Sequence, residues 1–177
     1  MRKLTHEELG KKRVTLDEIK KVKRYPIYVI CDNIRSIYNV GSIFRTSDAA
    51  LIEKLYLTGY TPHPPRPEIE KVALGSTNSV PWEYFKNPMD AINDIKSKGI
   101  KIASLEIADS SKKYYEVTKN DFPICIILGN ELTGVSNELV EASDFSIEIP
   151  QFGFKHSMNV AVAYGIAVFE MLKIANE

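Results

Sequence analysis

The stretch IPQFGFKHSMNVAVA, residues 149–163, joins a short apolar strand pattern to a long apolar helix pattern. Pro150 ends the strand, a glycine-containing loop follows, and Ser157 and Asn159 stand at the start of the expected helix. The free N–H groups of a helix N-terminus can bind ligand oxygen atoms. Ser157 could equally be a plain N-cap, whereas an asparagine inside an apolar helix is costly unless its amide has partners. Asn159 is therefore the strongest single functional candidate.

The rest of the chain alternates short β-branched runs with helical patterns. Continuous apolar strands are typical of a buried parallel sheet, and their alternation with helices predicts a doubly wound α/β fold. The expected strands are residues 27–31, 54–58, 100–107, 124–128 and 146–149. The expected helices are residues 41–51, 87–99 with an Asn-Pro cap, 136–142 with a serine cap, and 157–174.

Length and charge indicate a basic N-terminal arm, residues 1–24, followed by a single domain, residues 25–177. A chain of 177 residues with 44% hydrophobic content suits one core. The arm carries nine Lys or Arg against four acids, a net charge of +5, in a chain that is neutral as a whole. Such an arm can contact a polyanion, although charged termini are often merely solvated. We expect about the first dozen residues to be loosely ordered.

The cysteines and histidines indicate the compartment and argue against a metal. Cys31 and Cys125 are isolated in apolar strand-like runs, and the chain opens with neither a secretory nor a transmembrane segment, so we expect a reducing cytoplasm. His6, His63 and His156 have no ligand spacing. With no cysteine or carboxylate cluster beside them, we expect no protein-bound metal.

Two further blocks place polar residues against apolar runs. NVGSIFR, residues 39–45, follows a strand whose carboxyl end is where sheets of this class bind ligands. Alone, Asn39 could be an N-cap and Arg45 a solvated helix position. LGNELTGV, residues 128–135, contains glycines that permit tight turning or close backbone approach, and Glu131 alone could be a solvated loop carboxylate.

Two other segments suggest contacts outside the domain. The last helix pattern is apolar nearly all round and rich in small residues, which suits a buried core helix or, as we favour, the interface of a homodimer. The loop over residues 61–79 holds four prolines and is too long and polar for a simple connection, so we expect it to face a substrate. Its prolines could otherwise act as plain rigidifiers.

Taken in chain order, residues 39–45, 128–135 and 149–163, the three blocks resemble the signature of the SpoU (TrmH) family of RNA ribose 2′-O-methyltransferases, part of the SPOUT superfamily. The resemblance runs from about residue 27 to residue 172. It implies S-adenosylmethionine as cofactor, an obligate dimer, and a parallel sheet flanked by helices with a C-terminal trefoil knot. The chain lacks the extra N-terminal RNA-binding domain of many ribosomal-RNA members, so tRNA is favoured over rRNA as substrate.

The resemblance also assigns residues to roles. It implies a catalytic group made of Asn39, Arg45, Glu131, Ser157 and Asn159. It implies cofactor binding, mainly through main-chain groups, at Leu105, Gly129, Ile149 and Met158. It places Arg66 and Lys71 on the RNA path. Tyr25, Tyr60, Trp82 and Tyr84 could stack on bases, although we expect packing in the core to be their main role.

The expected chemistry needs a ribose 2′-hydroxyl to lose its proton while it is aligned with the methyl donor. Because the pKa of arginine is above about 12, we hypothesise that Arg45 positions a substrate phosphate and assists proton loss rather than acting as the base. Gln151, Ser42 and Met158 depart from common family forms, and only Gln151 would alter the cofactor pocket's edge.

Two alternatives remain open at this point. One is a non-catalytic RNA-binding or assembly factor on the same fold, against which the complete set of five catalytic candidates argues. The other is a SPOUT enzyme that methylates a base.

No G-x-G-x-x-G motif follows residues 27–31 and no Walker A sequence occurs, which argues against nicotinamide chemistry and nucleotide hydrolysis.

Overall fold

The computed structural model describes residues 1–11 and 14–177, so Lys12 and Arg13 of the basic arm lie outside the described residues. One seven-stranded sheet has the order β3-β2-β1-β6-β4-β7-β5, and the pairings between these strands are all parallel. The strands are β1 (Tyr25–Asp32), β2 (Ile52–Thr58), β3 (Trp82–Phe85), β4 (Lys101–Leu105), β5 (Lys112–Lys113), β6 (Ile124–Leu128) and β7 (Phe145–Glu148). The predicted parallel sheet flanked by helices is confirmed.

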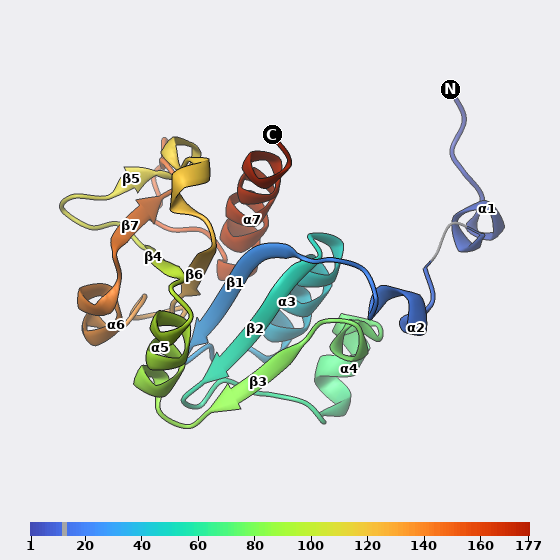
Figure 1. Cartoon of the computed structure of the whole chain (residues 1–177), viewed down its shortest axis with the longest axis horizontal. Coiled ribbons are helices and arrows are strands. Elements are labelled where there is room, and N and C mark those ends of the chain that lie inside the picture. Colours follow the sequence, from blue (N-terminus) through green and yellow to red (C-terminus); the bar gives the residue numbers. More distant parts are fainter. Residues whose placement is uncertain (12–13) are drawn as a thin grey trace.

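Helices cover both faces of the sheet (Figure 1). The α-helices are α1 (His6–Gly10), α2 (Leu16–Ile19), α3 (Ile37–Ala49), α4 (Pro67–Ala73), α5 (Pro88–Ser97), α6 (Asn137–Ala142) and α7 (Val160–Asn176), and the 3-10 turns are η1 (Ser76–Asn78), η2 (Tyr114–Glu116) and η3 (Lys119–Asp121). One core packs α3, α4 and α7 against the sheet, and a second packs α5 and α6 on the opposite face. Because both faces are covered, β6 is buried along its whole length, which explains its continuous apolar sequence.

The two edge strands of the sheet are absent from the sequence-based expectation. No residue of β3 is fully buried, and β5 has only two residues, so neither carries the apolar run that marks a central strand. The strand expected over residues 100–107 ends earlier, because β4 stops at Leu105. The five central strands were predicted because burial on both faces selects apolar residues, a constraint that edge strands escape.

Two helices begin at other residues than expected. The N-cap of α3 is Ser36, whose Oγ accepts a hydrogen bond from the backbone N–H of Asn39 at 3.3 Å, so the interpretation of Asn39 as an N-cap is wrong. The N-cap of α7 is Asn159, whose Oδ1 accepts from the N–H groups of Ala161 and Val162 at 2.9 and 3.3 Å. Ser157 therefore lies outside the helix and is not its cap.

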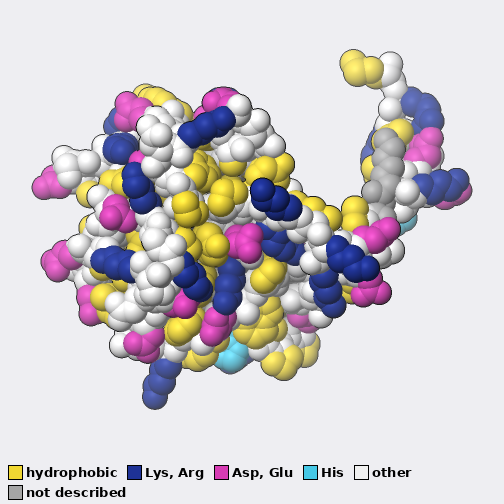
Figure 2. All heavy atoms as spheres, in the orientation of Figure 1, with side chains coloured by type: hydrophobic (Ala, Val, Ile, Leu, Met, Phe, Trp, Pro, Cys, Tyr) yellow, Lys and Arg dark blue, Asp and Glu magenta, His cyan; other side chains and the backbone are white. Residues whose placement is uncertain are grey.

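The basic arm leads away from the sheet (Figure 1). Within the first dozen residues, which we expected to be loosely ordered, α1 forms a short helix. A capping box between Thr5 and Glu8 closes its N-terminus, but none of its residues is buried. Figure 2 shows Lys and Arg side chains along the arm and at its junction with the body. At that junction the Arg24 guanidinium donates to the carbonyl oxygens of Ile52 and Ser79. No helix in the described part of the chain is long and apolar enough to cross a membrane.

Candidate active site

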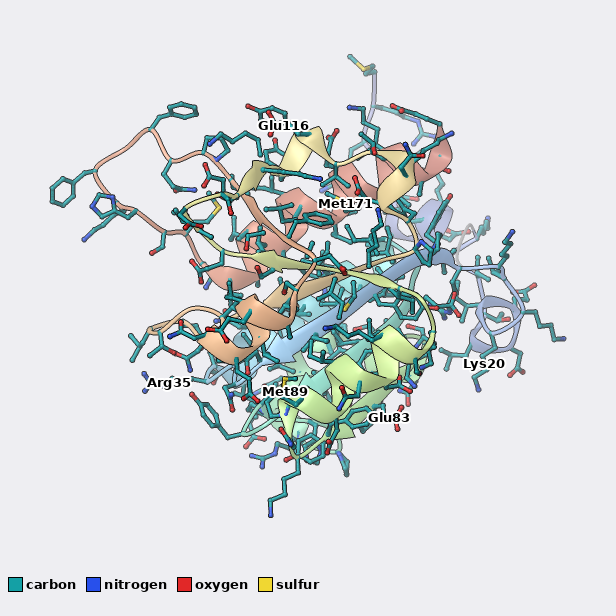
Figure 3. All side chains as sticks on the ribbon, turned by 60° about the vertical axis from the view of Figure 1, so that its left-hand side comes forward. Lys20, Arg35, Glu83, Met89, Glu116 and Met171 are labelled. Atoms are coloured by element: carbon teal, nitrogen blue, oxygen red, sulfur yellow. The ribbon has the colours of Figure 1, made fainter. Side chains whose placement is uncertain are left out.

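A cleft of about 970 Å³ opens at the carboxyl ends of β4, β6 and β7 and at the start of α7. Its walls are the loop after β4, the loop between β6 and α6, and the long loop between β7 and α7, which extends from the body in Figure 3. The carboxyl edge of a parallel sheet is where such folds bind their ligands. The cleft is also of the size that holds a cofactor or drug-sized molecule, about 300 to 1,000 Å³.

All four residues that the resemblance assigns to the cofactor line this cleft: Leu105, Gly129, Ile149 and Met158. They come from the carboxyl ends of three different strands and from the entry to α7, as expected. The structure brings them together, and their role in binding stays a prediction. Gln151, the departure noted in the sequence, also lines the cleft and donates from Nε2 to the carbonyl oxygen of Ile149 at 2.9 Å.

Three catalytic candidates form one hydrogen-bonded chain at the edge of the cleft. Asn39 donates from Nδ2 to Glu131 Oε1 at 2.7 Å, and Asn159 donates from Nδ2 to Asn39 Oδ1 at 3.0 Å. Glu131 and Asn159 line the cleft, whereas Asn39 reaches them from the first turn of α3. Residues more than 90 positions apart in the sequence are thereby joined, because β1 and β6 are neighbours in the sheet.

The Glu131 carboxylate also holds the approach to α3. It accepts from the backbone N–H groups of Arg35 and Ser36 at 2.8 and 2.9 Å, immediately before that helix. Partial burial by itself would raise the pKa of Glu131, but the hydrogen bonds from Arg35, Ser36 and Asn39 outweigh it and lower this pKa below its ordinary value. Glu131 is therefore an ionised acceptor that orients Asn39.

The position of Asn159 differs from the one proposed from the sequence. It does not stand inside an apolar helix but caps it, and its amide is used at both ends: Oδ1 accepts from the helix N-terminus while Nδ2 donates to Asn39. The expectation that this amide needs partners holds. The cap fixes the side chain in the orientation that reaches Asn39.

Two glycines in the loop after β6 are required by close contacts. A Cβ on Gly129 would lie 2.1 Å from the backbone nitrogen of Val135, and a Cβ on Gly134, whose φ is +71°, would lie 2.1 Å from Glu106 Oε2. The same loop is closed by paired backbone hydrogen bonds between Asn130 and Gly134 at 2.9 and 3.0 Å. The backbone of this wall of the cleft is therefore held in one shape.

Replacing Gly129 by alanine is expected to lower stability by about 1 to 3 kcal/mol, because the new methyl group overlaps fixed backbone. The affinity for S-adenosylmethionine should fall with it, since the loop must shift. Thermal unfolding and calorimetric titration would measure both effects. Gly153→Ala is the matched control for stability, because a Cβ there meets nothing within 4 Å. Equal stability of the two variants would contradict this account.

The sequence reasoning missed two buried polar residues that hold these loops in place. Asn130 donates from Nδ2 to the carbonyl oxygen of Asn33 at 2.8 Å, and its Oδ1 accepts from the N–H groups of Leu132 and Thr133. Asp32, at the end of β1, accepts from the N–H of Ser136 at 2.9 Å. The only available signal was their place at the ends of the two central strands, where polar residues next to apolar runs need partners.

Two catalytic candidates are not joined to this chain of hydrogen bonds. Ser157 lines the cleft but is exposed, and none of the hydrogen bonds in the described part of the structure involves its hydroxyl. Arg45 is exposed and lies six residues beyond Asn39, about 9 Å along α3. It lines a separate hollow of about 350 Å³ between α3 and α7, together with Phe169. Within this chain, Arg45 is therefore outside the cleft.

The two residues proposed to contact RNA, Arg66 and Lys71, lie at α4, away from the cleft. Arg66 is the N-cap residue of α4 and Lys71 lies in its last turn, and both side chains are exposed. Neither lines the cleft. α4 packs on α3, so both residues are on the same side of the sheet as Arg45.

Neither metal nor thiol chemistry is indicated in the described residues. No cluster of three or more His, Cys, Asp or Glu side chains that could hold a metal ion occurs among them. Cys31 and Cys125 are buried free thiols, and burial raises the pKa of each, which disfavours a reactive thiolate.

Comparison with known proteins defines the class. The structure superposes on an AdoMet-bound rRNA methyltransferase from Sinorhizobium meliloti (TM-score 0.80, 29% identity, 88% of this chain and 59% of that one). It likewise superposes on the TrmH/SpoU tRNA modifying enzyme of Aquifex aeolicus (TM-score 0.81, 31% identity, 91% of this chain and 81% of that one). The fold is that of an RNA methyltransferase of this type.

Sequence comparison gives the family. The model of the SpoU rRNA Methylase family matches residues 26–169, and the chain belongs to this family. The tRNA (guanosine(18)-2′-O)-methyltransferase of Aquifex aeolicus is 34% identical over 163 residues, which is 92% of this chain and 76% of that protein. The Escherichia coli K12 protein of the same name is 28% identical, and the match covers 84% of this chain but only 64% of that protein.

Proposed function

We propose that this protein transfers a methyl group from S-adenosylmethionine to a ribose 2′-hydroxyl of RNA, with tRNA as the favoured substrate. The observation that carries the proposal is the Glu131–Asn39–Asn159 chain of hydrogen bonds at the edge of a cofactor-sized cleft. Relatives named as tRNA 2′-O-methyltransferases support the choice of tRNA.

The residues of the cleft fit S-adenosylmethionine. Leu105, Ile149 and Met158 offer apolar contact for an adenine ring, and the glycine-containing loop after β6 leaves backbone close to the space. When bound, this cofactor supplies an electrophilic methyl group. The protein contributes by holding the ribose hydroxyl in line with it, and positioning of this kind can supply roughly 7 to 11 kcal/mol.

The protein contributes to the reaction by aligning the ribose and by placing a positive charge near it. Asn39 and Asn159 present amide groups, fixed by Glu131 and by the start of α7, against which a ribose can be oriented. Arg45, with its permanently charged planar guanidinium, binds a phosphate of the substrate and stabilises the negative charge that develops on the 2′-oxygen as its proton passes to solvent. Arg66 and Lys71 bind the RNA further from the cleft, and the basic arm adds attraction to the phosphate backbone.

We further propose a homodimer formed through α7. Val162 and Phe169 are 55% and 48% exposed on this helix, although its other side belongs to the core. Large apolar side chains exposed on one helix face favour contact with another protein surface. Arg45 borders the same face, so a partner subunit packed there receives the Arg45 side chain near its own surface.

Replacing Phe169 by glutamate is expected to convert the dimer into monomers, because a charge would be buried in the interface. Methyl transfer should fall with dissociation. Sedimentation velocity measures the mass, and Leu9→Glu, on an exposed residue of α1 in the arm, is the control that should leave it unchanged. A monomeric wild-type protein would overturn the dimer.

The C-terminal region is proposed to form the trefoil knot that the resemblance implies. The support is the strand order, in which β6 lies between β1 and β4, and the packing of α7 back onto β1 and α3. Threaded chains are rare exceptions to ordinary connectivity, so tracing the chain through a crystal structure is the direct test.

The proposed function is tested by transfer of labelled methyl from S-adenosylmethionine to tRNA and rRNA prepared from cells that lack this protein. Digestion to nucleosides identifies the product. A 2′-O-methyl nucleoside is the expected result. A methylated base would instead indicate a base-methylating SPOUT enzyme, and cofactor binding without transfer to any RNA would indicate a non-catalytic binding protein.

A further inference from the structure

The turn that follows β2 is fixed to the neighbouring strands on several sides. Thr61 Oγ1 donates to the carbonyl oxygen of Cys31 and accepts from the N–H of Ile34, each at 3.0 Å. The Tyr84 hydroxyl donates to the carbonyl oxygen of Gly59 at 2.7 Å. Gly59 has a φ of +64°, and a Cβ there would lie 2.0 Å from Asn33 Oδ1, so only glycine fits. The turn is rigid before any ligand arrives.

Tyr60, at the tip of this turn, is held at both ends and yet exposed. Its backbone N–H donates to Asn33 Oδ1 at 3.2 Å, and its hydroxyl accepts from Asn130 Nδ2 at 2.5 Å. The residue is nevertheless 61% exposed, so the expectation that it packs in the core is wrong. A fixed aromatic ring with an open surface is suited to binding a flat ligand group.

The position of Tyr60 places this ring beside the catalytic candidates. Asn130, which holds the tyrosine hydroxyl, directly precedes Glu131 in the chain. Arg35 is bound through its backbone N–H to the Glu131 carboxylate, and its exposed side chain lies beside the loop after β6 (Figure 3). The Tyr60 ring and the Arg35 backbone are therefore both anchored to the loop that carries Glu131, at the edge of the site.

We propose that the Tyr60 ring stacks on a nucleobase of the RNA within one nucleotide of the methylated ribose, with the Arg35 guanidinium on the adjoining phosphate. This inference rests on the proposed function and names the part of the substrate held there. Every base has a flat face that can stack on an aromatic ring, and such stacking commonly dominates the binding of unpaired strands. Because the ring is already fixed, little conformational freedom is lost on binding.

The competing role for Tyr60 is to hold the loop through its hydroxyl alone. Two substitutions separate the roles: Tyr60→Phe removes the hydroxyl and keeps the ring, and Tyr60→Leu removes both but keeps an apolar side chain. Stacking predicts that Tyr60→Leu raises the Kd for unmodified tRNA and the KM in methyl transfer by about 5-fold to 100-fold. Tyr60→Phe should stay within about threefold of wild type, as its ring still stacks.

The experiment measures tRNA binding by filter retention without cofactor, methyl transfer at saturating cofactor, and S-adenosylmethionine binding by calorimetry for each variant. Unchanged cofactor binding establishes that the cleft is intact. Tyr115→Leu is the control, because this tyrosine is similarly exposed, at 54%, and does not line the cleft.

Each outcome is decisive. Wild-type Kd and KM in Tyr60→Leu would overturn stacking, and so would equal losses in Tyr60→Phe and Tyr60→Leu, which would assign the effect to the hydroxyl. A wild-type protein that binds tRNA without methylating any RNA would overturn the proposed function instead. The Kd comparison between the two Tyr60 variants would still decide the inference in that case.

Discussion

Replacing Arg45 by alanine is expected to reduce methyl transfer to RNA by about 100-fold or more, because a preorganised charge at a reacting group is worth that much. The affinity for S-adenosylmethionine should be unchanged, since Arg45 does not line the cleft. Single-turnover transfer and calorimetric titration would separate the two effects. Arg45→Lys should recover little activity, because an ammonium group keeps the charge but loses the planar pair of donors. Full activity in Arg45→Ala would remove arginine from the mechanism.

A second measurement tells which cleft Arg45 serves. Arg45→Ala and Asn159→Ala subunits, each inactive as homodimers, can be expressed together. If Arg45 acts on the cleft of its partner, mixed dimers contain one complete site, and about a quarter of wild-type activity should return. If Arg45 acts on the cleft of its own chain, no complete site forms. Because Arg45 lies beside the exposed face of α7 and outside its own cleft, we expect activity to return.

Replacing Glu131 by glutamine is also expected to cause a large loss of methyl transfer. The carboxylate accepts three hydrogen bonds, from the N–H groups of Arg35 and Ser36 and from the Asn39 amide. A glutamine offers one oxygen and a donor that cannot accept, so at least one of these donors faces another donor. We expect methyl transfer to fall about 100-fold as Asn39 loses its orientation, with a loss of stability of about 1 kcal/mol because the site is partly exposed.

The stability effect of Glu131→Gln should depend on pH in a defined direction. Because hydrogen bonds lower the pKa of Glu131 in the folded protein, its ionised form stabilises the fold above the unfolded pKa of about 4.3. This contribution is lost as the pH falls through the lower, folded pKa. The difference in free energy of unfolding between wild type and variant should therefore be constant from about pH 7 to pH 5 and shrink in more acidic solution. A difference that grows on acidification would contradict the assigned pKa direction.

The sequence predicted those parts of the fold that burial dictates. The apolar runs over residues 27–31 and 124–128 became the central strands β1 and β6, because only apolar residues suit a sheet covered on both faces. The edge strand β3 escaped prediction because its side chains are partly or fully exposed, so that no periodic pattern is selected. The start of α7 was misplaced by three residues, since both Ser157 and Asn159 are good N-caps and only the loop path decides between them.

The candidate site was predictable to the extent that its residues follow strand ends. Glu131 and Asn159 were identified from polar residues beside apolar runs, and the structure joins both through Asn39. The position of Arg45 could not be predicted in this way, because a spacing of six residues on α3 turns its side chain away from the direction of Asn39. The contribution of Asn130 was equally hidden, since its partners Asn33 and Tyr60 come from loops 97 and 70 residues away.

The hydrogen bond between Asn39 and Asn159 joins residues 120 positions apart in the sequence, so it can form only late in the synthesis of the chain. A chain emerging from the ribosome completes β1 and α3 long before the segment that forms one wall of the cleft. Until residues 149–160 appear, Asn39 has no partner on α7 and the cleft lacks a side. We therefore expect a partly translated chain to bind S-adenosylmethionine poorly. The cleft becomes complete only with about the last sixth of the chain, residues 149–177, after all the strands of the sheet have been made.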